Sequence, residues 1–136
     1  MASIVDLIRR WRDRMLSVLR IMVGLLFLEH GTAKWLSFPY SATYAHLNPL
    51  SLTGVAGFLE LIGGILLTLG LFTRATAFIL SGEMAAAYFL SHAPRGFFPL
   101  LNGGDAAILY CVTFFYLVFA GGGPWSLDAR RPAAAD

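Results

Sequence analysis

A set of ionisable residues lies within or at the edges of long apolar runs, where a charge is costly unless it is paired or hydrated. Buried carboxylates and imidazoles can take up and release protons, whereas ammonium and imidazole groups donate hydrogen bonds to carbonyl oxygens. These residue types in apolar surroundings therefore indicate proton transfer or the binding of a polar head group. The set comprises Arg20, Glu29, His30, Lys34, Glu60, Glu83, His92 and Asp105.

Glu60 and Glu83 are the most informative members, because each lies near the middle of its apolar run. A charge at the centre of a membrane helix costs at least about 2.5–3.5 kcal/mol, whereas a polar contact between membrane helices contributes about 0.6 kcal/mol. Polar contacts that only hold helices together would thus not offset the cost of two such acids. A purely structural role for the acids is the alternative interpretation. The sequence favours a polar cavity that serves a quinone, a proton path, an ion or a small solute.

The composition argues against an ordinary soluble monomer. Of the 136 residues, 57% are hydrophobic and 13% are charged, against about 25% charged residues in average soluble proteins. In water such a chain would expose large apolar patches. The net charge of +2 arises from arginines that form no recurring basic face, so the sequence does not predict nucleic-acid binding. The single cysteine, Cys111, excludes an intrachain disulfide.

Four apolar runs approach or reach the length of about 17–25 residues that a helix needs to cross a bilayer. Unpaired backbone groups are costly in lipid, so we expect these runs to be helical. The sequence predicts an all-α fold, an integral membrane bundle of four antiparallel helices over residues 15–122, with a cytoplasmic tail over residues 123–136. The expected spans are residues 15–35, 51–72, 75–91 and 106–121.

The first residues, 1–14, are predicted to form a short amphipathic helix at the membrane interface. Ile4, Ile8 and Trp11 recur there at helical spacing, and arginines lie between them. This segment would precede the first span as a separate element.

The distribution of arginines predicts the orientation, because positive residues near span ends favour the cytoplasmic side. With four spans, Lys34 and Arg95 fall on the outer side and the other basic residues near span ends fall on the inner side. We therefore expect a multi-pass protein of the bacterial cytoplasmic membrane with both termini in the cytoplasm. The inner set comprises Arg9, Arg10, Arg12, Arg14, Arg74, Arg130 and Arg131.

One face of the first span carries charges beside glycines, which allow membrane helices to pack closely. Two ion pairs would balance the buried charges, Arg20 with Glu83 and Lys34 with Glu60. Glu29 points roughly away from this face, towards lipid headgroups or a second copy of the chain. The charged face comprises Arg20, Gly24, Phe27, Gly31 and Lys34.

The expected cavity lies in the outer half of the bundle and holds a quinone head group. Basic side chains would donate hydrogen bonds to the quinone oxygens, and the two acids would carry protons. Tyr116, which shares a helical stripe with Leu109 and Val112, would flank the ring. The predicted lining comprises His30, Lys34, Glu60, Glu83 and His92.

Metal and haem sites are not predicted. The histidines and acids have ligand chemistry, but they lack the tight spacing on one helix that is typical of a metal site in a bundle. Nothing in the sequence fixes the spacing of His30 and His92 as a haem pair.

Asn102 and Asp105 are expected to cap the start of the fourth span. A side-chain oxygen can accept a hydrogen bond from a free backbone N–H at a helix start. An acid there is also favoured by the positive end of the helix dipole.

Three motifs resemble those of the DoxX family, small four-helix proteins of the bacterial inner membrane. RxxxGxxFxxHGxxK begins at Arg20, ExxGG begins at Glu60, and NGG followed by an acid covers residues 102–105, with Asp where many members have Glu. The similarity extends from about residue 15 to residue 130. The resemblance implies a link to quinone or sulfur redox chemistry, and a partner redox enzyme.

Two hypotheses follow for the function. The first is a redox-associated membrane subunit with a quinone-binding or proton-relaying cavity, at most an oxidoreductase subunit that acts with quinone and a partner. The alternative is a non-catalytic membrane scaffold, or a protein that binds a lipid or a small solute. Membrane lipids and further copies of the chain are expected partners in either case.

Overall fold

The computed structural model describes residues 3–131, and within that range the chain is helical with no β-strand. The long elements are α1 (Ile4–Trp35), α2 (Leu52–Leu69), α3 (Thr73–Ala87) and α5 (Asp105–Ala120). α3 continues without interruption into a π-helical turn, Tyr88–His92. The short elements are 3-10 turns at Ala42–Tyr44, Ala93–Arg95 and Asp128–Arg130, and α4 (Pro99–Asn102).

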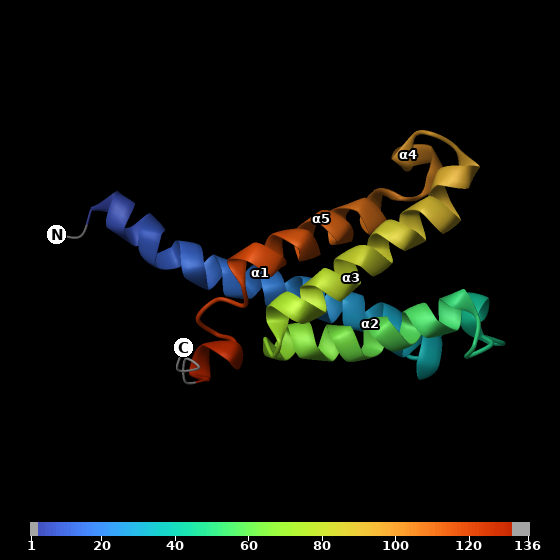
Figure 1. Ribbon diagram of the computed structural model, residues 1–136, viewed down its shortest axis with the longest axis horizontal. Coiled ribbons are helices and arrows are strands. Elements are labelled where there is room, and N and C mark those ends of the chain that lie inside the picture. Colours follow the sequence, from blue (N-terminus) through green and yellow to red (C-terminus); the bar gives the residue numbers. More distant parts are fainter. Residues whose placement is uncertain (1–2, 132–136) are drawn as a thin grey trace.

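The long helices form two antiparallel pairs, α1 with α2 and α3 with α5 (Figure 1). A tight turn joins the pairs between α2 and α3. From that turn the pairs diverge towards the end that carries α4 (Figure 1). The termini of the described chain lie at the opposite end.

α1 and α2 pack closely because glycines lie between them. A Cβ atom on Gly31 would lie 2.6 Å from Cα of Leu61, and one on Gly64 would lie 2.6 Å from Cα of Leu28. Any larger side chain would force the two backbones apart. This close approach brings the buried side chains of the two helices into contact.

Apolar side chains from all four long helices form the buried core. Phe27 of α1 packs edge-on against Phe114 of α5, with ring centroids 4.9 Å apart. Leu67 of α2 and Leu80 of α3 are buried in the same cluster. The core therefore joins the two pairs on the side of the molecule near the α2–α3 turn.

The ends of α2 follow from local sequence. The Ser51 hydroxyl accepts a hydrogen bond from the Gly54 N–H (3.1 Å) and caps the helix start. Gly70 ends the helix with φ of 69°, a left-handed conformation in which glycine avoids the steric penalty of a side chain. α2 is accordingly shorter than the predicted span 51–72.

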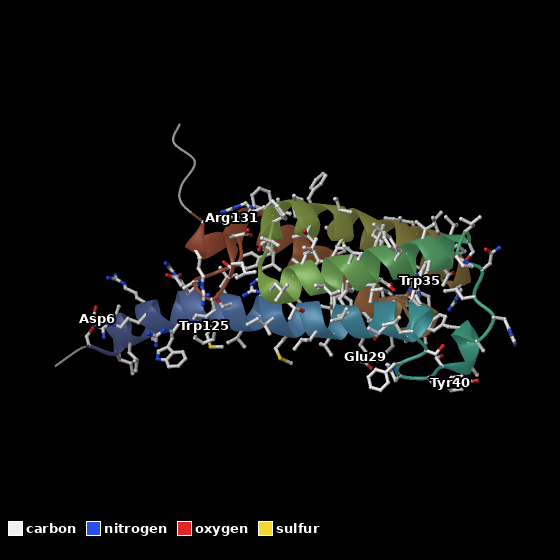
Figure 2. The ribbon with its side chains drawn as sticks, turned by 90° about the horizontal axis from the view of Figure 1, so that it is seen from below. Asp6, Glu29, Trp35, Tyr40, Trp125 and Arg131 are labelled. Atoms are coloured by element: carbon white, nitrogen blue, oxygen red, sulfur yellow. The ribbon has the colours of Figure 1, made fainter. Side chains whose placement is uncertain are left out.

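α1 is one continuous helix from Ile4, so the predicted separate helix over residues 1–14 is not a distinct element. No proline or glycine lies near the expected boundary at residue 14 to interrupt the helix. Its N-terminal part projects beyond the other helices at the end that carries Asp6 (Figure 2). Residues 1 and 2 of that prediction lie outside the described residues.

The segment after α5 is folded back onto the helix ends, although the sequence predicts a tail there. The N–H of Leu127 donates to the Leu69 carbonyl (3.1 Å), and the N–H of Asp128 donates to the Gly70 carbonyl (2.9 Å). These bonds fasten the segment to the end of α2. The last part of the predicted tail, residues 132–136, lies outside the described residues.

Within the described part of the chain, two helices, α1 and α2, are long and apolar enough to cross a membrane. α5 is also apolar but shorter. Large apolar side chains are exposed along the outer faces of the helices, among them Met22, Phe78 and Phe119. The chain thus has the surface expected of a membrane protein.

Candidate functional site

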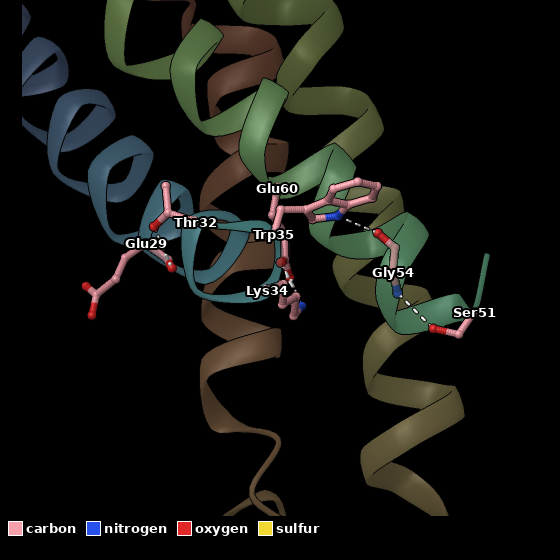
Figure 3. Close-up of polar contacts among 7 residues, drawn as sticks. All are labelled: Glu29, Thr32, Lys34, Trp35, Ser51, Gly54 and Glu60. Atoms are coloured by element: carbon pink, nitrogen blue, oxygen red, sulfur yellow. Dashed lines mark hydrogen bonds and ion pairs between the residues drawn. The ribbon is translucent and has the colours of Figure 1, made fainter. Parts of the chain in front are cut away.

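A buried ion pair lies between α1 and α2. Lys34 Nζ is 2.6 Å from both carboxylate oxygens of Glu60. The two side chains are only 9% and 5% exposed. Figure 3 shows Lys34 directed towards Glu60. The close packing at Gly31 allows this contact, because it brings the two helix backbones together beside the pair.

Aromatic residues cover the ion pair at the end of α1. Trp35 Nε1–H donates to the Gly54 carbonyl of α2 (3.0 Å), which fixes the indole beside the pair (Figure 3). Lys34 Nζ also lies 5.7 Å from the ring centroid of Tyr44, within range of a cation–π interaction. The ammonium group is therefore enclosed by a carboxylate and an aromatic face.

The carboxylate of Glu83 on α3 is buried and has no hydrogen-bond partner among the described residues. Both carboxylate oxygens are inaccessible and accept no hydrogen bond within residues 3–131. Glu60 and Lys34 lie close enough for their charges to act on Glu83. The two acids and the lysine thus form one electrostatic group that spans α1, α2 and α3.

The predicted ion pair between Arg20 and Glu83 is not formed. Arg20 is 0% exposed, and its guanidinium donates to backbone carbonyls instead. Nη1 lies 2.5 Å from the Leu67 oxygen and 2.6 Å from the Thr68 oxygen. These carbonyls belong to the last turn of α2, where helical N–H donors run out, although the Leu67 oxygen also accepts from the Gly70 N–H (3.0 Å). Arg20 therefore closes the end of α2.

Arg20 also holds the segment that follows α5. Its Nε–H donates to the Gly122 carbonyl (2.7 Å), and its Nη2 donates to the Trp125 carbonyl (3.0 Å). The Ser17 hydroxyl, one turn earlier on α1, accepts from the Trp125 N–H (3.1 Å). Arg20, which was predicted to pair with Glu83, therefore joins α1 to the end of α2 and to the segment after α5.

His30 lies beside Tyr110, one helical turn before Lys34 on α1. The two rings meet edge-on with centroids 6.2 Å apart, and Tyr110 is close enough to Glu60 for the two to interact electrostatically. His30 itself is exposed on α1. Glu29 is exposed too and points away from the ion pair, as predicted from its helical position (Figure 3).

The predicted position of Tyr116 at the site is wrong. Tyr116 is 54% exposed, and its stripe partners Leu109 and Val112 are 68% and 63% exposed. The face of α5 that packs inwards instead carries Tyr110 and Phe114. Spacing by three and four residues marks both stripes equally, so only the packing distinguishes them.

His92 contacts the loop around α4, away from the position predicted in the cavity. Its Nδ1 lies 3.1 Å from the Asn102 carbonyl oxygen, and its ring stacks against Tyr88 at 6.4 Å. The π-helical turn that contains His92 leads directly into this loop. His92 therefore contributes to the structure of this loop and does not lie beside the buried group.

Asn102 does not cap α5 as predicted. Its side-chain oxygen accepts from the N–H of Gly104 (2.8 Å), and its Nδ2 donates to the Gly96 carbonyl (2.8 Å). The residue at the N-cap of α5 is Gly104, which makes no side-chain cap. Asn102 closes the loop, while Asp105 lies in the first turn of α5, where the helix dipole favours an acid.

Two further polar residues close helix ends and were not predicted from the sequence. Asp128 accepts from the N–H groups of Phe72 (2.9 Å) and Thr73 (2.8 Å) and caps the start of α3. Arg74 donates to the carbonyls of Val118 (2.7 Å) and Phe119 (2.6 Å) at the end of α5. The sequence shows a change from apolar to polar residues after α5. This change does not indicate which groups Asp128 and Arg74 would bond.

The cap formed by Asp128 influences its protonation. Burial by itself would raise the pKa of Asp128, but hydrogen bonds from Thr73 and Phe72, together with the charge of Arg131, outweigh burial. The pKa of this carboxyl therefore lies below its ordinary value.

The structure thus brings together a subset of the predicted site residues. Lys34, Glu60 and Glu83 form the buried group, with His30 and Tyr110 beside it, whereas Arg20, His92 and Tyr116 lie elsewhere. The group offers a hydrogen-bond donor, acceptors and an acid that can exchange a proton. Within residues 3–131, no three His, Cys, Asp or Glu side chains are placed to share a metal ion.

Comparison with known proteins identifies relatives along most of the chain. A protein of Haemophilus influenzae, described as uncharacterized, is 50% identical over 90% of this chain and 95% of its own length. A second Haemophilus influenzae protein with the same description is 31% identical over 83% of this chain and 80% of its own length.

A protein of Mycobacterium tuberculosis described as an uncharacterized membrane protein is 26% identical over 82% of this chain and 78% of its own length. No solved structure matches. The sequence model of the DoxX family matches residues 15–93, from the start of the apolar part of α1 through the turn after α3. The chain belongs to the DoxX family.

Proposed function

We propose that the chain is a multi-pass protein of the bacterial cytoplasmic membrane with four spans. Besides α1 and α2, the third span would be α3 with its π-helical turn, residues 73–92, which form one continuous helical segment. At about 1.5 Å per residue, that segment reaches the thickness of a hydrocarbon core, about 30 Å. α5 would be a shorter fourth span.

The arginines and tryptophans support an orientation with both termini in the cytoplasm. Trp35 lies near one end of the helix array and Trp125 near the other, as in the aromatic belts of membrane proteins (Figure 2). The arginine-rich part of α1 and the ends tied by Arg20 and Arg74 lie at the Trp125 end. This end would face the cytoplasm.

We further propose that the group around Glu83 is a proton-exchanging site for a quinone head in the outer half of the membrane. The observation that carries this proposal is the pair of buried Glu83 oxygens that accept no hydrogen bond within the described chain. A buried polar group without a partner costs about 1–3 kcal/mol. Such a group is often explained by a ligand or a catalytic role.

A quinone supplies two-electron, two-proton redox chemistry, and its carbonyl oxygens need hydrogen-bond donors. Protonated Glu83 can donate such a bond, and deprotonated Glu83 can take up a proton again. Glu60 would hold the Lys34 ammonium in place next to the acid. His30, exposed and beside Tyr110, would exchange protons with the outer surface. The electrons would come from a partner redox enzyme.

The test is the quinone content of protein purified in mild detergent. An organic extract would be analysed by mass spectrometry and ultraviolet absorption, with a mock membrane preparation as background. We expect near-stoichiometric quinone in the wild type and its loss in Glu83→Gln. Glu29→Gln is the matched control, because it removes an acid from the exposed side of α1 in the same half of the molecule.

Only background quinone in a folded wild-type sample that retains its lipids would contradict the quinone site. Equal quinone in wild type and Glu83→Gln would remove Glu83 from it. A loss in both Glu83→Gln and Glu29→Gln would indicate a general effect of charge on membrane extraction, and not a site at Glu83.

A non-catalytic scaffold is the second candidate, and the projecting part of α1 favours it. This part extends past the other helices, with Ile4 74% and Ile8 63% exposed (Figure 1). A partner protein or a second copy of the chain would pack on it. Deleting residues 3–12 should then abolish copurification of that partner while leaving quinone content unchanged.

A further inference from the structure

We infer that a groove at the arginine-rich end binds the phosphate of an anionic phospholipid. It lies between the N-terminal half of α1 and the segment after α5. One wall is arginine-rich and the other is made of small residues and proline. The lining comprises Arg10, Asp13, Arg14, Leu16, Ala120, Gly123, Pro124 and Ala129.

The charge of the groove favours an anion. Arg10 and Arg14 lie one helical turn apart and so face the same side of α1. Asp13 is the acid in the lining, and its carboxylate already accepts a hydrogen bond from Arg12 Nε (3.1 Å). The two groove arginines thus present a net positive charge, and guanidinium groups bind phosphate oxygens with two parallel hydrogen bonds.

The depth of the groove matches the lipid headgroups. The apolar part of α1 begins at Met15, so Arg14 lies at the boundary and Arg10 lies about 6 Å further along the helix. The Arg14 guanidinium sits 5.2 Å from the Trp11 ring centroid. Tryptophan at this position is typical of the membrane interface.

The remaining lining explains why the ligand is a lipid and not free phosphate. Leu16 and Ala120 lie on the membrane side of the arginines, where an acyl chain would continue along the helices. A free phosphate would use the arginines alone. A phospholipid would use both parts of the groove.

The far wall is fixed in place before any ligand binds. Gly123 is packed so closely on α1 that a Cβ atom there would lie 2.9 Å from the Ser17 nitrogen and 3.1 Å from the Asp13 oxygen. Arg20 holds the neighbouring Trp125 carbonyl. A wall that is already in place lowers the ordering cost of binding.

This inference uses the proposed orientation only to assign the groove to the cytoplasmic leaflet, and it does not involve the quinone site. The test is native mass spectrometry of the full chain in detergent with added phosphatidylglycerol, phosphatidylcholine or inorganic phosphate. We expect the wild type to retain phosphatidylglycerol in preference to phosphatidylcholine. Arg10→Gln/Arg14→Gln should lower the apparent affinity by about 30-fold, on the scale of two arginines near an anionic headgroup.

Two variants complete the experiment. Arg9→Gln/Arg130→Gln removes the same charge from exposed positions outside the groove and should retain the lipid. Arg10→Lys/Arg14→Lys keeps the charge and should recover most of the binding. It also provides a folded comparison if the glutamine variant does not fold.

Three results would overturn the inference. Equal loss of the lipid in Arg10→Gln/Arg14→Gln and in the control Arg9→Gln/Arg130→Gln would show a general charge effect. Unchanged binding in Arg10→Gln/Arg14→Gln would exclude the groove. Displacement of the lipid by millimolar inorganic phosphate would show that free phosphate, and not a lipid, is the ligand.

Discussion

The ionisable side chains at the two ends of the helix array are bonded in different ways. At the end that carries the termini, Arg20, Arg74 and Asp128 close the ends of α2, α5 and α3 with hydrogen bonds of 2.5–3.0 Å. At the other end, Lys34 and Glu60 satisfy one another, while Glu83 accepts no hydrogen bond within the described chain. The first arrangement stabilises the fold, and the second leaves an acid without a hydrogen bond within residues 3–131.

The comparison teaches that charge in this protein has two separate uses. A guanidinium bonded to carbonyls of two segments acts as a structural tie, since neither the charge nor its partners can move without exposing unsatisfied groups. The Glu83 carboxyl, which has no hydrogen-bond partner within the described residues, does not join two segments in this way. Substitutions at the two ends should therefore differ in their effects on stability.

The largest effect is expected for Arg20→Met. The substitution leaves the carbonyls of Thr68 and Trp125 without a donor, and it removes one of two donors from those of Leu67 and Gly122. Each buried unsatisfied group costs about 1–3 kcal/mol. We expect the free energy of unfolding to fall by about 4 kcal/mol or more. Equilibrium unfolding in detergent measures this loss, with the exposed Arg9→Met as control. A loss no larger than that of Arg9→Met would contradict the structural tie.

The next effect concerns Lys34→Met at the outer end. It leaves Glu60 buried without its counter-charge, which costs about 3–5 kcal/mol in a buried pair. The double variant Lys34→Met/Glu60→Met should regain most of that loss, because no charge remains unpaired. The same unfolding measurement applies, and a double variant as unstable as the single one would show that the pair is not coupled.

A smaller effect is expected for Asp128→Asn. Replacing a capping residue costs about 1 kcal/mol, and only the acid responds to pH. Because the pKa of Asp128 in the folded state lies below its ordinary value, its contribution is present above the unfolded pKa. It is lost as the pH falls through the folded one. Unfolding followed below about pH 4 should show a shallower acid loss in the variant, and an identical pH profile would count against the cap.

The smallest effect on stability is expected for Glu83→Gln. The acid forms no hydrogen bond within residues 3–131, so an isosteric amide removes no contact. We expect a change within about 0.5 kcal/mol, together with the loss of quinone described above. A large destabilisation would mean that Glu83 has a structural partner after all, and the contrast between the two ends would fail.

The faces of the first two spans were predictable because glycines and charges mark them. Gly24, Phe27 and Gly31 are buried on α1, as their shared stripe with Arg20 indicates. Close packing requires glycine, and burial of a charge requires neighbouring helices, so both features point inwards. The pairing of Lys34 with Glu60 follows from such faces.

α5, the fourth predicted span, lacks these markers, and the face that packs inwards is not the one that was predicted. α5 is apolar on all sides, and in a membrane the lipid-facing side is as apolar as the core. Nothing in its sequence separates the stripe of Tyr116 from that of Tyr110. Contacts such as Arg20 with Gly122 or Asp128 with Thr73 join distant residues, and no local pattern encodes them.

The clasp formed by residues 122–128 has a consequence for biogenesis. The residues that complete the ends of α2 and α3 follow all the long helices in the chain, so the ribosome delivers them last. In the proposed membrane topology, the turn between α2 and α3 would lie in the headgroup region during synthesis, with its carbonyl and N–H groups bound to water. We expect helical hairpins to insert first, and the clasp then to convert two independently inserted hairpins into one cooperative unit.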